Sequence, residues 1–349
     1  MKTMKKIIAS LATIAMLAVL FTGCEEKEKK KELVKFNVGH LTSTGHILYF
    51  IAQEKGFFKA NGLDVELFQF NNSGEGINAI IAGKLDAGSF GTAPPFTFIE
   101  KGADITIFGG QMTEGHALVA KPEIAEQIKS ITDLKGKTIA TVRLATGDIA
   151  FRSALSVAGV DWKKDITIKE MESPAAALEV VKKGDADAGV VWTPFRKMAE
   201  DQGLKILFYS GELNNLTGHP CCRQIAVTEK LKQRENDYRN FLVALIQAYD
   251  FYKTNQEESI DILSKYVKVD KAILYAETYG PHIGSSPDPN KEGVIKFWNA
   301  MIAAGYLTDK TIDVANYVNT ALFEAALDIA LKADPNNANY KQLKAEFKK

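Results

Sequence analysis

The segment whose side chains are best suited to binding or reaction is His219-Pro220-Cys221-Cys222-Arg223. Imidazole and thiolate groups bind soft metal ions, adjacent cysteines can form a strained vicinal disulfide, and a guanidinium can hold a carboxylate, sulfonate or phosphate. The same residues could instead be packed core and a salt bridge. If the segment is extended, His219 and Cys221 share one face and Cys222 takes the other. We favour packing first, ligand contact by Cys222 or Arg223 second, and a metal third.

Strand-like and helix-like segments alternate through the part of the chain that must position this string. Alternating apolar and polar residues predict strands at 33–41 and 63–70, and amphipathic runs predict helices at 47–58 and 77–85. The alternation continues to about Trp192, and from Asp237 onward only helical periods remain. This order is typical of an α/β protein with two mostly parallel sheets flanked by helices, followed by a helical C-terminal third.

Loops that lead from a strand to a helix are where open α/β sheets bind ligands. Five such loops are rich in Gly, Ser, Thr, Asn or Pro, so their backbone N–H groups can face a ligand. They span 42–46, 71–76, 91–95, 145–148 and 193–194. Because they are spread over two α/β halves, they predict a cleft between two lobes.

Composition and charge exclude several classes of protein. The 349 residues carry 43 basic and 43 acidic side chains, and 46% are hydrophobic. This is the composition of a globular protein, and its length favours two lobes. Without the first 23 residues, which hold three lysines and no acid, the net charge is −3. We therefore expect no attraction to nucleic acid. The sequence has no Gly-rich phosphate loop, no His-Glu-x-x-His and no Gly-x-Ser-x-Gly motif, and we expect neither a cofactor nor a metal.

The N-terminus resembles an export signal with a lipid attachment site. Three lysines precede an apolar run at 7–21, which is shorter than a membrane span, and the run closes on Thr22-Gly23-Cys24. LFTGC at 20–24 resembles the bacterial lipobox, in which the Cys becomes the lipid-modified first residue. The alternative is a plain signal peptide with an incidental Cys. Eight consecutive charged residues follow at 25–32, and we expect a flexible tether there.

Four segments of the body resemble one family, the two-lobed, periplasmic-type substrate-binding proteins of ABC importers for nitrate, sulfonates, taurine and thiamine-pyrimidine precursors. They are GHILYFIAQEKGFF at 45–58, AGKLDAG at 82–88, DLKGKTIA at 133–140 and KGDADAGVVWTPF at 183–195. The resemblance implies a periplasmic-binding-protein-like (type II) fold with a hinge between its lobes. It places lobe 1 at 33–116 and 222–332 and lobe 2 at 117–221, after a signal (1–23) and tether (24–32) and before a polar tail (333–349).

The resemblance also maps the ligand onto the loops named above. The candidate ligand-binding residues are Thr44, His46, Ser73, Gly74, Thr92, Ala93, Thr146, Gly147, Asp148, Trp192, Cys222 and Arg223. Sulfonate and nitrate binders typically have a hydroxyl-rich turn where this chain has residues 145–148. Asp148 in this segment would repel an anion, or would accept a hydrogen bond from a ligand amine or hydroxyl. It could equally cap the following helix.

The function that the resemblance implies is capture of a small organic or anionic solute outside the cell for an ABC permease and its ATPase subunit. We expect a monomer, anchored by lipid on Cys24 to the extracytoplasmic face of the membrane, and no enzymatic activity. The alternative is a protein that binds a thiamine-pyrimidine precursor, or a related pyrimidine-synthase-like enzyme. That enzyme carries a run of cysteines, which Cys221-Cys222 of this chain faintly resembles.

Overall fold

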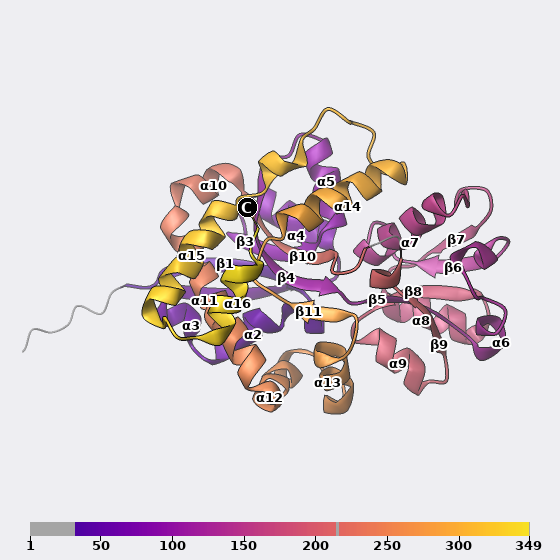
Figure 1. Cartoon of the computed structure of the whole chain (residues 1–349), viewed down its shortest axis with the longest axis horizontal. Coiled ribbons are helices and arrows are strands. Elements are labelled where there is room, and N and C mark those ends of the chain that lie inside the picture. The colour runs from indigo at the N-terminus through magenta and orange to yellow at the C-terminus, as the bar shows by residue number, and fades with distance from the viewer. Residues whose placement is uncertain (1–31, 214–215, 349) are drawn as a thin grey trace, which may run out of the picture. The chain divides into compact units, whose positions relative to one another are not determined.

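The computed structural model describes residues 32–213 and 216–348. The predicted signal, the lipidation residue Cys24 and nearly all of the predicted tether lie outside these ranges. Residues 33–349 form one compact unit, built on a six-stranded and a five-stranded sheet (Figure 1).

The six-stranded sheet, sheet A, has the strand order β11-β4-β10-β3-β1-β2. β1 pairs in parallel with β2 and β3, whereas β10 runs antiparallel to β3 and β4, and β11 runs antiparallel to β4. The bounds are β1 Val34–Leu41, β2 Leu63–Phe70, β3 Ala87–Gly91, β4 Ile105–Glu114, β10 Pro220–Val227 and β11 Ile283–Ser285.

The five-stranded sheet, sheet B, has the strand order β7-β6-β8-β5-β9. β6 is parallel to β7 and β8, and β5 is antiparallel to β8 and β9. The bounds are β5 His116–Ala120, β6 Thr138–Thr141, β7 Thr167–Glu170, β8 Ala188–Trp192 and β9 Lys205–Tyr209.

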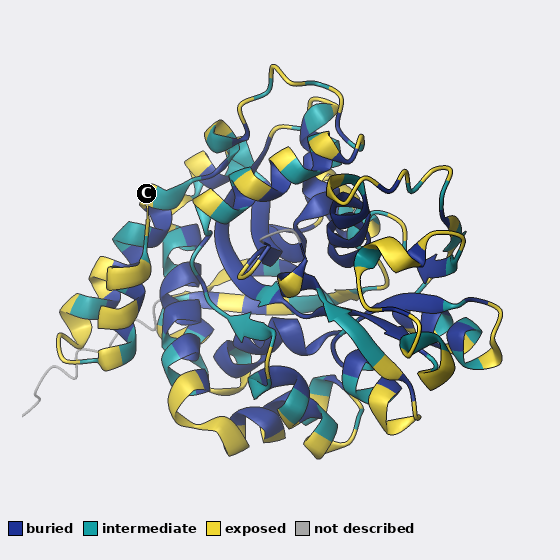
Figure 2. Cartoon of the chain, turned by 45° about the vertical axis from the view of Figure 1, so that its right-hand side comes forward, coloured by how far each residue is buried: buried dark blue, intermediate teal, exposed yellow. Residues whose placement is uncertain are grey.

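Helices cover both faces of each sheet, because each face carries apolar side chains that must be buried. In sheet A, α2, α11 (Glu235–Thr254) and α15 (Thr320–Ala333) bury one face, and α4, α5 and α14 (Lys291–Ala303) bury the other. In sheet B, α7 lies on one face and α8 and α9 lie on the other. Figure 2 shows the inward faces of these helices in dark blue. The bounds are α2 Ile47–Glu54, α3 Phe57–Ala60, α4 Ser73–Ile81, α5 Ala93–Glu100, α6 Pro122–Ala125, α7 Thr146–Val157, α8 Pro174–Lys183 and α9 Phe195–Asp201.

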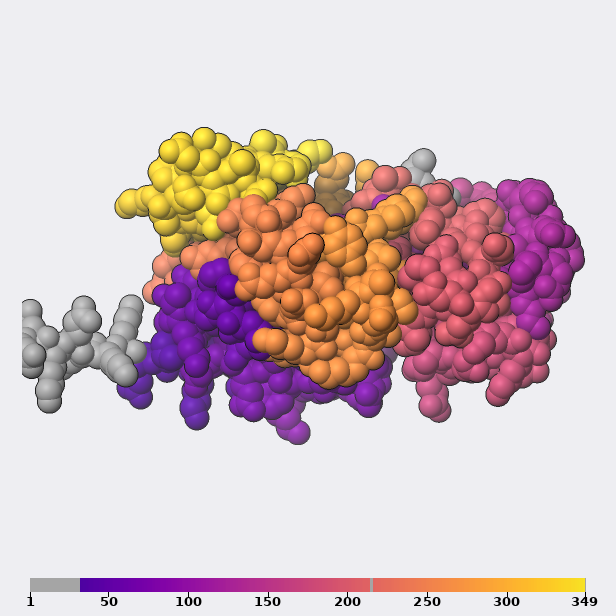
Figure 3. Space-filling model, turned by 90° about the horizontal axis from the view of Figure 1, so that it is seen from below, coloured from indigo at the N-terminus to yellow at the C-terminus, as the bar shows by residue number. Residues whose placement is uncertain are grey.

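The C-terminal third is helical, as expected, with one short strand that the sequence pattern did not indicate. β11 has three residues, too few to show an alternating pattern. The region expected to be a polar tail contains α16, whose Tyr340 and Leu343 are buried in the core of sheet A. Figure 3 shows the C-terminal helices (yellow) against the orange segment that contains α11 and α12. The bounds are α10 Thr228–Gln233, α11 Glu235–Thr254, α12 Gln256–Tyr266, α13 Lys271–Tyr279, α14 Lys291–Ala303, α15 Thr320–Ala333 and α16 Ala338–Glu346.

Both sheets are mixed, whereas the strand–helix alternation predicts mostly parallel ones. The antiparallel pairs involve the strands at which the chain changes sheets. The chain leaves sheet A at the end of β4, turns at Gly115 (φ 86°) and enters sheet B as β5. It leaves sheet B through β9 and returns to sheet A as β10, which therefore runs opposite to β4. Within the described residues, no helix is long and apolar enough to cross a membrane.

Candidate functional site

A cavity of about 290 Å³ lies between the two sheets, at the lower end of the range for small-molecule sites. Strand ends and the loops that follow them supply its walls, as expected for open α/β sheets. The residues of sheet A that line it are Leu41, Ser43, His46, Asn71, Asn72, Ser73, Gly74, Gly91, Pro94, Thr97, Phe98, Met112, Cys221 and Cys222. Sheet B contributes His116, Val142, Arg143, Leu144, Ala145, Thr146, Glu172 and Trp192.

Two helices begin at this cavity, one from each sheet. Asn72 caps α4 by accepting a hydrogen bond from the Glu75 N–H at 3.0 Å. Ala145, at the start of α7, provides no side-chain cap. The first N–H groups of α7 therefore lack a capping side chain, and a helix start in this state carries a partial positive charge that favours an anionic or hydrogen-bond-accepting group.

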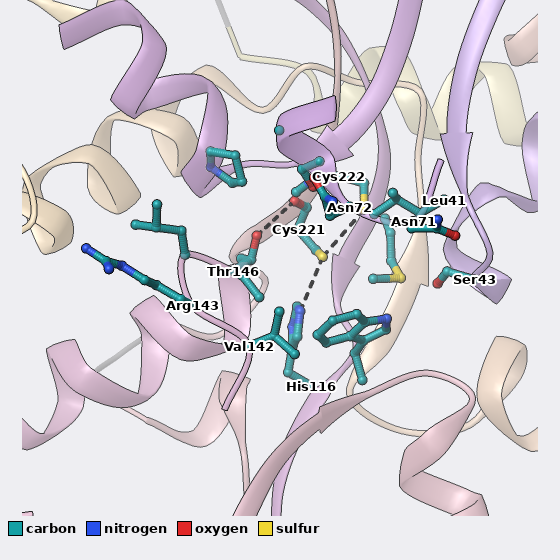
Figure 4. A pocket seen from close by; sticks show the side chains of 18 of the residues that line it. Leu41, Ser43, Asn71, Asn72, His116, Val142, Arg143, Thr146, Cys221 and Cys222 are labelled. Carbon is teal, nitrogen blue, oxygen red and sulfur yellow. Dashed lines mark hydrogen bonds between the residues drawn. The ribbon is translucent and has the colours of Figure 1, made fainter. Parts of the chain in front are cut away.

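The two cysteines lie on the same wall, contrary to the expectation for an extended segment. Cys221 Sγ is 3.6 Å from Cys222 Sγ and 3.7 Å from His116 Nε2 (Figure 4). The pairing of β10 with β4 shifts register on both sides of Cys222, so β10 is bulged there, and a bulge breaks the alternation of side chains. Both thiols are free and buried. Burial and the adjacent Cys222 raise the pKa of Cys221 well above its usual value, so Cys221 is a neutral thiol.

The histidines of the cavity are uncharged near neutral pH. Burial lowers the pKa of both His46 and His116 well below the usual value. His46 Nε2 accepts a hydrogen bond from the Leu41 N–H at 3.3 Å, which places the proton of the neutral ring on Nδ1. That Nδ1–H has no hydrogen-bond partner among the described residues. His46 thus leaves one buried donor available in the wall of the cavity.

Charged side chains lie only at the edge of this cavity, as far as the described lining goes. Arg143 has a side chain that is 66% exposed, and its Nε lies 3.8 Å from Glu170 Oε1. Such an exposed pair contributes little to stability and is screened by salt. Trp192 offers a flat aromatic surface, with the His116 ring in an edge-on arrangement at 6.3 Å.

Six of the candidate residues line the cavity: His46, Ser73, Gly74, Thr146, Trp192 and Cys222. The other six do not: Thr44, Thr92, Ala93, Gly147, Asp148 and Arg223.

Asp148 is a buried structural anion. Its Oδ1 accepts hydrogen bonds from Arg152 Nε at 2.7 Å and from the Thr141 hydroxyl at 3.0 Å. Its Oδ2 accepts from the Leu144 N–H at 3.0 Å and from the Tyr306 hydroxyl at 3.2 Å. Both carboxylate oxygens are therefore occupied, and neither the expected repulsion of an anion nor the expected contact with a ligand amine follows from this arrangement. The side-chain N-cap alternative also differs from the structure, since Asp148 is the third residue of α7.

Thr92 and Thr146 meet at the Cys221 carbonyl, which ties the two halves of the site together. The Thr92 N–H and hydroxyl donate to this oxygen at 2.5 and 2.8 Å, and the Thr146 hydroxyl donates at 3.4 Å. Gly147 lies behind the wall, where a Cβ would come within 2.6 Å of the His116 ring. Ala93 is buried in the core of sheet A.

Thr44 belongs to a buried contact between the sheets. Its hydroxyl donates to the Glu277 carbonyl at 2.7 Å and also contacts the Thr193 hydroxyl. Thr193 Oγ1 donates to the same carbonyl at 3.0 Å, and the Ser43 hydroxyl donates to the Thr193 carbonyl at 3.4 Å. Residues of the first and last expected loops thus hold the lobes together beside the cavity.

Several lining residues were not among the sequence candidates. Met112 and Cys221 lie on strands, where only the three-dimensional pairing shows which face they occupy. Glu172 belongs to the loop between β7 and α8, a strand-to-helix loop whose Ser173-Pro174 start signal could have added it. Arg143 lies two residues before a loop that was considered, which begins at Ala145. No group of three or more His, Cys, Asp or Glu side chains in 32–213 and 216–348 is arranged to hold a metal ion.

Comparison with known proteins identifies the class of this chain. It belongs to the NMT1-like family, whose model matches residues 29–267. A protein of Brucella abortus (strain 2308), named only as a binding protein, is 27% identical over 263 residues, which are 74% of this chain and 80% of that protein.

Solved structures of two periplasmic binding proteins share the fold. The periplasmic aliphatic sulphonate binding protein of Escherichia coli has a TM-score of 0.71 and 19% identity over 83% of this chain and 99% of its own. The periplasmic nitrate-binding protein of Synechocystis PCC 6803 has a TM-score of 0.74 and 19% identity over 88% and 92%. The expected two-lobed periplasmic-binding-protein fold is confirmed, as is the expected family.

Proposed function

We propose that this protein captures a small organic or anionic solute in the cavity between its lobes and delivers it to an ABC importer of the nitrate, sulfonate and taurine type. The observation that carries the proposal is the cavity of about 290 Å³ that both sheets line with strand ends, loops and helix starts. Buried thiols and neutral imidazoles line it instead of an acid–base pair, which favours binding over catalysis.

The solute would be held by backbone and neutral side-chain donors. A polar or anionic head group would sit at the start of α7, near the Thr146 hydroxyl, and opposite Ser73 and Gly74 of α4. The Nδ1–H of His46 would supply a further donor. An organic body would stack on Trp192 and contact Cys222. These six residues are our proposed ligand contacts.

The surroundings of the protein follow from the same proposal. Lipid on Cys24 would anchor a monomer to the extracytoplasmic face of the membrane, where a permease and its ATPase subunit receive the solute. Binding would close the lobes, and small-angle scattering would show a smaller radius of gyration in the saturated protein. Metabolic labelling with a radioactive fatty acid should mark the wild-type protein and leave Cys24→Ser unmarked.

The test is isothermal titration of the purified protein with taurine, an alkanesulfonate, nitrate and an aminopyrimidine. We expect one-to-one binding of at least one of them, weakened about tenfold or more in Trp192→Ala. Trp298→Phe serves as a control, because Trp298 is buried in the core of sheet A and does not line the cavity. Equal affinities in the wild type and Trp192→Ala would contradict the proposed site.

A thiamine-pyrimidine precursor is the second candidate solute. It is favoured by the neutral His46 and His116 and the aromatic Trp192, which suit a flat, uncharged heterocycle better than a bare oxyanion. Binding of the aminopyrimidine alone in the titration would select this candidate.

A further inference from the structure

Arg223 lines a second cavity, of about 280 Å³, in place of the one between the lobes. Cys222 and Arg223 are successive residues of β10, and they line different cavities. Ser286, Asp288 and Lys291, which precede or start α14, also line this second cavity, together with Glu346 and Lys348 near the C-terminus.

The Arg223 side chain is buried, with 1% of its surface exposed. Its Nη1 donates to the Cys222 carbonyl at 3.0 Å and its Nη2 to the Met112 carbonyl at 3.4 Å. Its Nε has no partner among the described residues, and no ion pair with a described carboxylate is formed. A buried charge without an opposite charge in contact is destabilising, so an anionic group of a ligand that contacted Arg223 would stabilise this side chain.

The absence of a side chain at Gly110 makes space for the Arg223 side chain. Arg223 pairs with Gly110 across β10 and β4, and a Cβ on Gly110 would lie 2.4 Å from Arg223 Nη1. The same Cβ would lie 2.1 Å from the Asp288 carbonyl oxygen and 2.6 Å from that of Ser286. Only a glycine at this position lets the guanidinium cross β4 toward the cavity.

Asp288 supplies the opposite charge in the same cavity. One of its carboxylate oxygens, Oδ1, accepts a hydrogen bond from the Asn290 N–H at 2.7 Å. Burial raises the pKa of Asp288, while Arg223 acts on it electrostatically without direct contact. Of the other charged groups, Lys348 pairs with Glu292 at 3.1 Å, and Lys291 and Glu346 carry opposite signs. The lining has no excess of either sign, which disfavours a bare anion.

We propose that this cavity is a second binding site, for a small zwitterion whose carboxylate contacts Arg223 and whose ammonium group contacts Asp288. Free α-amino acids are the class of compound that combines the two groups on one carbon. The solute would contact both the buried Arg223 and the half-buried Asp288, which line the same cavity and form no ion pair with each other among the described residues. This site is separate from the cavity between the lobes and does not depend on the function proposed for that cavity.

The test is isothermal titration of the full-length protein with the common α-amino acids, acetate and methylammonium. At least one amino acid should bind one-to-one, about tenfold or more tightly than acetate or methylammonium. Asp288→Asn and Arg223→Lys should each weaken this binding about tenfold or more. Asp309→Asn, which changes a half-buried carboxylate outside the cavity, should leave amino-acid binding unchanged.

Two variants separate a loss of the site from misfolding and from binding at the other cavity. Asp288→Asn retains the hydrogen-bond acceptor for Asn290, so it tests the site even if Arg223→Lys does not fold. Trp192→Ala should leave amino-acid binding intact, because Trp192 lines the other cavity. The proposal is overturned if no amino acid binds, or if Trp192→Ala abolishes binding while Asp288→Asn retains it.

Discussion

Arg196 of α9 and Glu277 of α13 form a buried ion pair that joins the sheet B lobe to the sheet A lobe. Arg196 Nε lies 2.9 Å from Glu277 Oε2, and the two side chains are 3% and 4% exposed. The Lys197 N–H donates to the other carboxylate oxygen at 2.7 Å, and Arg196 Nη1 donates to the His282 carbonyl at 3.0 Å. With the contact between Thr44 and Thr193, this pair joins the lobes beside the cavity in this conformation.

Removal of one member of this pair should destabilise the protein strongly. Glu277→Gln leaves the Arg196 charge buried and unpaired, and we expect a loss of about 3–5 kcal/mol in the free energy of unfolding, measured with urea. Glu179→Gln is the matched control, because Glu179 and Lys182 form an exposed ion pair of similar length on α8. The control should behave like the wild type. Equal stability of Glu277→Gln and the control would show that the buried pair does not hold the lobes.

Asp148→Asn separates a structural role from ligand binding at a residue that the sequence placed in the site. We expect a loss of about 3–5 kcal/mol in stability, because Arg152 would lose its buried partner. Solute affinity should change by less than about twofold in the folded fraction, since both oxygens of Asp148 are already occupied within the protein. Intact stability combined with a large loss of affinity would place Asp148 in contact with the solute.

Gly147→Ala should disturb the wall of the cavity from behind. The new methyl group would lie 2.6 Å from the His116 ring and 3.0 Å from Val190 Cγ1, and such overpacking costs about 1–3 kcal/mol. Solute affinity should fall as well, because His116 lines the cavity. Gly74→Ala at the start of α4 is the comparison for stability, since its Cβ would meet only Asn72 Oδ1, at 3.4 Å. If both variants unfold at the same urea concentration as the wild type, Gly147 is not closely packed against the His116 ring.

Acid should destabilise the protein through its buried histidines. Burial lowers the pKa of His219 from 6.5 to about 4. The unfolded chain therefore binds more protons than the folded one as the pH falls from 6.5 toward 4, and stability is lost over that range. For His219 the loss between neutral pH and pH 5 should be about 2 kcal/mol. Urea unfolding of His219→Gln, which keeps a hydrogen-bonding side chain, should show a correspondingly weaker pH dependence; an unchanged dependence would contradict the assignment.

Local sequence patterns located much of the cavity but not all of its chemistry. Loops rich in Gly, Ser and Thr indicated where His46, Ser73 and Thr146 meet, because strand ends in an α/β sheet converge at one edge. The ion pair of Asp148 could be predicted in part, since Arg152 lies four residues later on the same helix face. Its contact with Tyr306, far along the chain, was not.

The positions of the cysteines and Arg223 depended on features without a sequence signal. The alternation rule separates Cys221 from Cys222, and a bulge places both in one wall. Arg223 was expected in the cleft, but strand pairing sends its side chain past Gly110 into another cavity. Such outcomes are set by tertiary packing and not by local periodicity.

Native mass spectrometry of the full-length protein, in the wild type and in Trp192→Ala, tests solute capture most directly. We predict that the wild type carries one small molecule per chain, either co-purified or taken from the panel of taurine, alkanesulfonate, nitrate and aminopyrimidine, and that Trp192→Ala loses it. A wild type that remains at its bare mass with every member of the panel, or a variant that retains the same bound molecule equally well, would contradict capture in the cavity between the lobes.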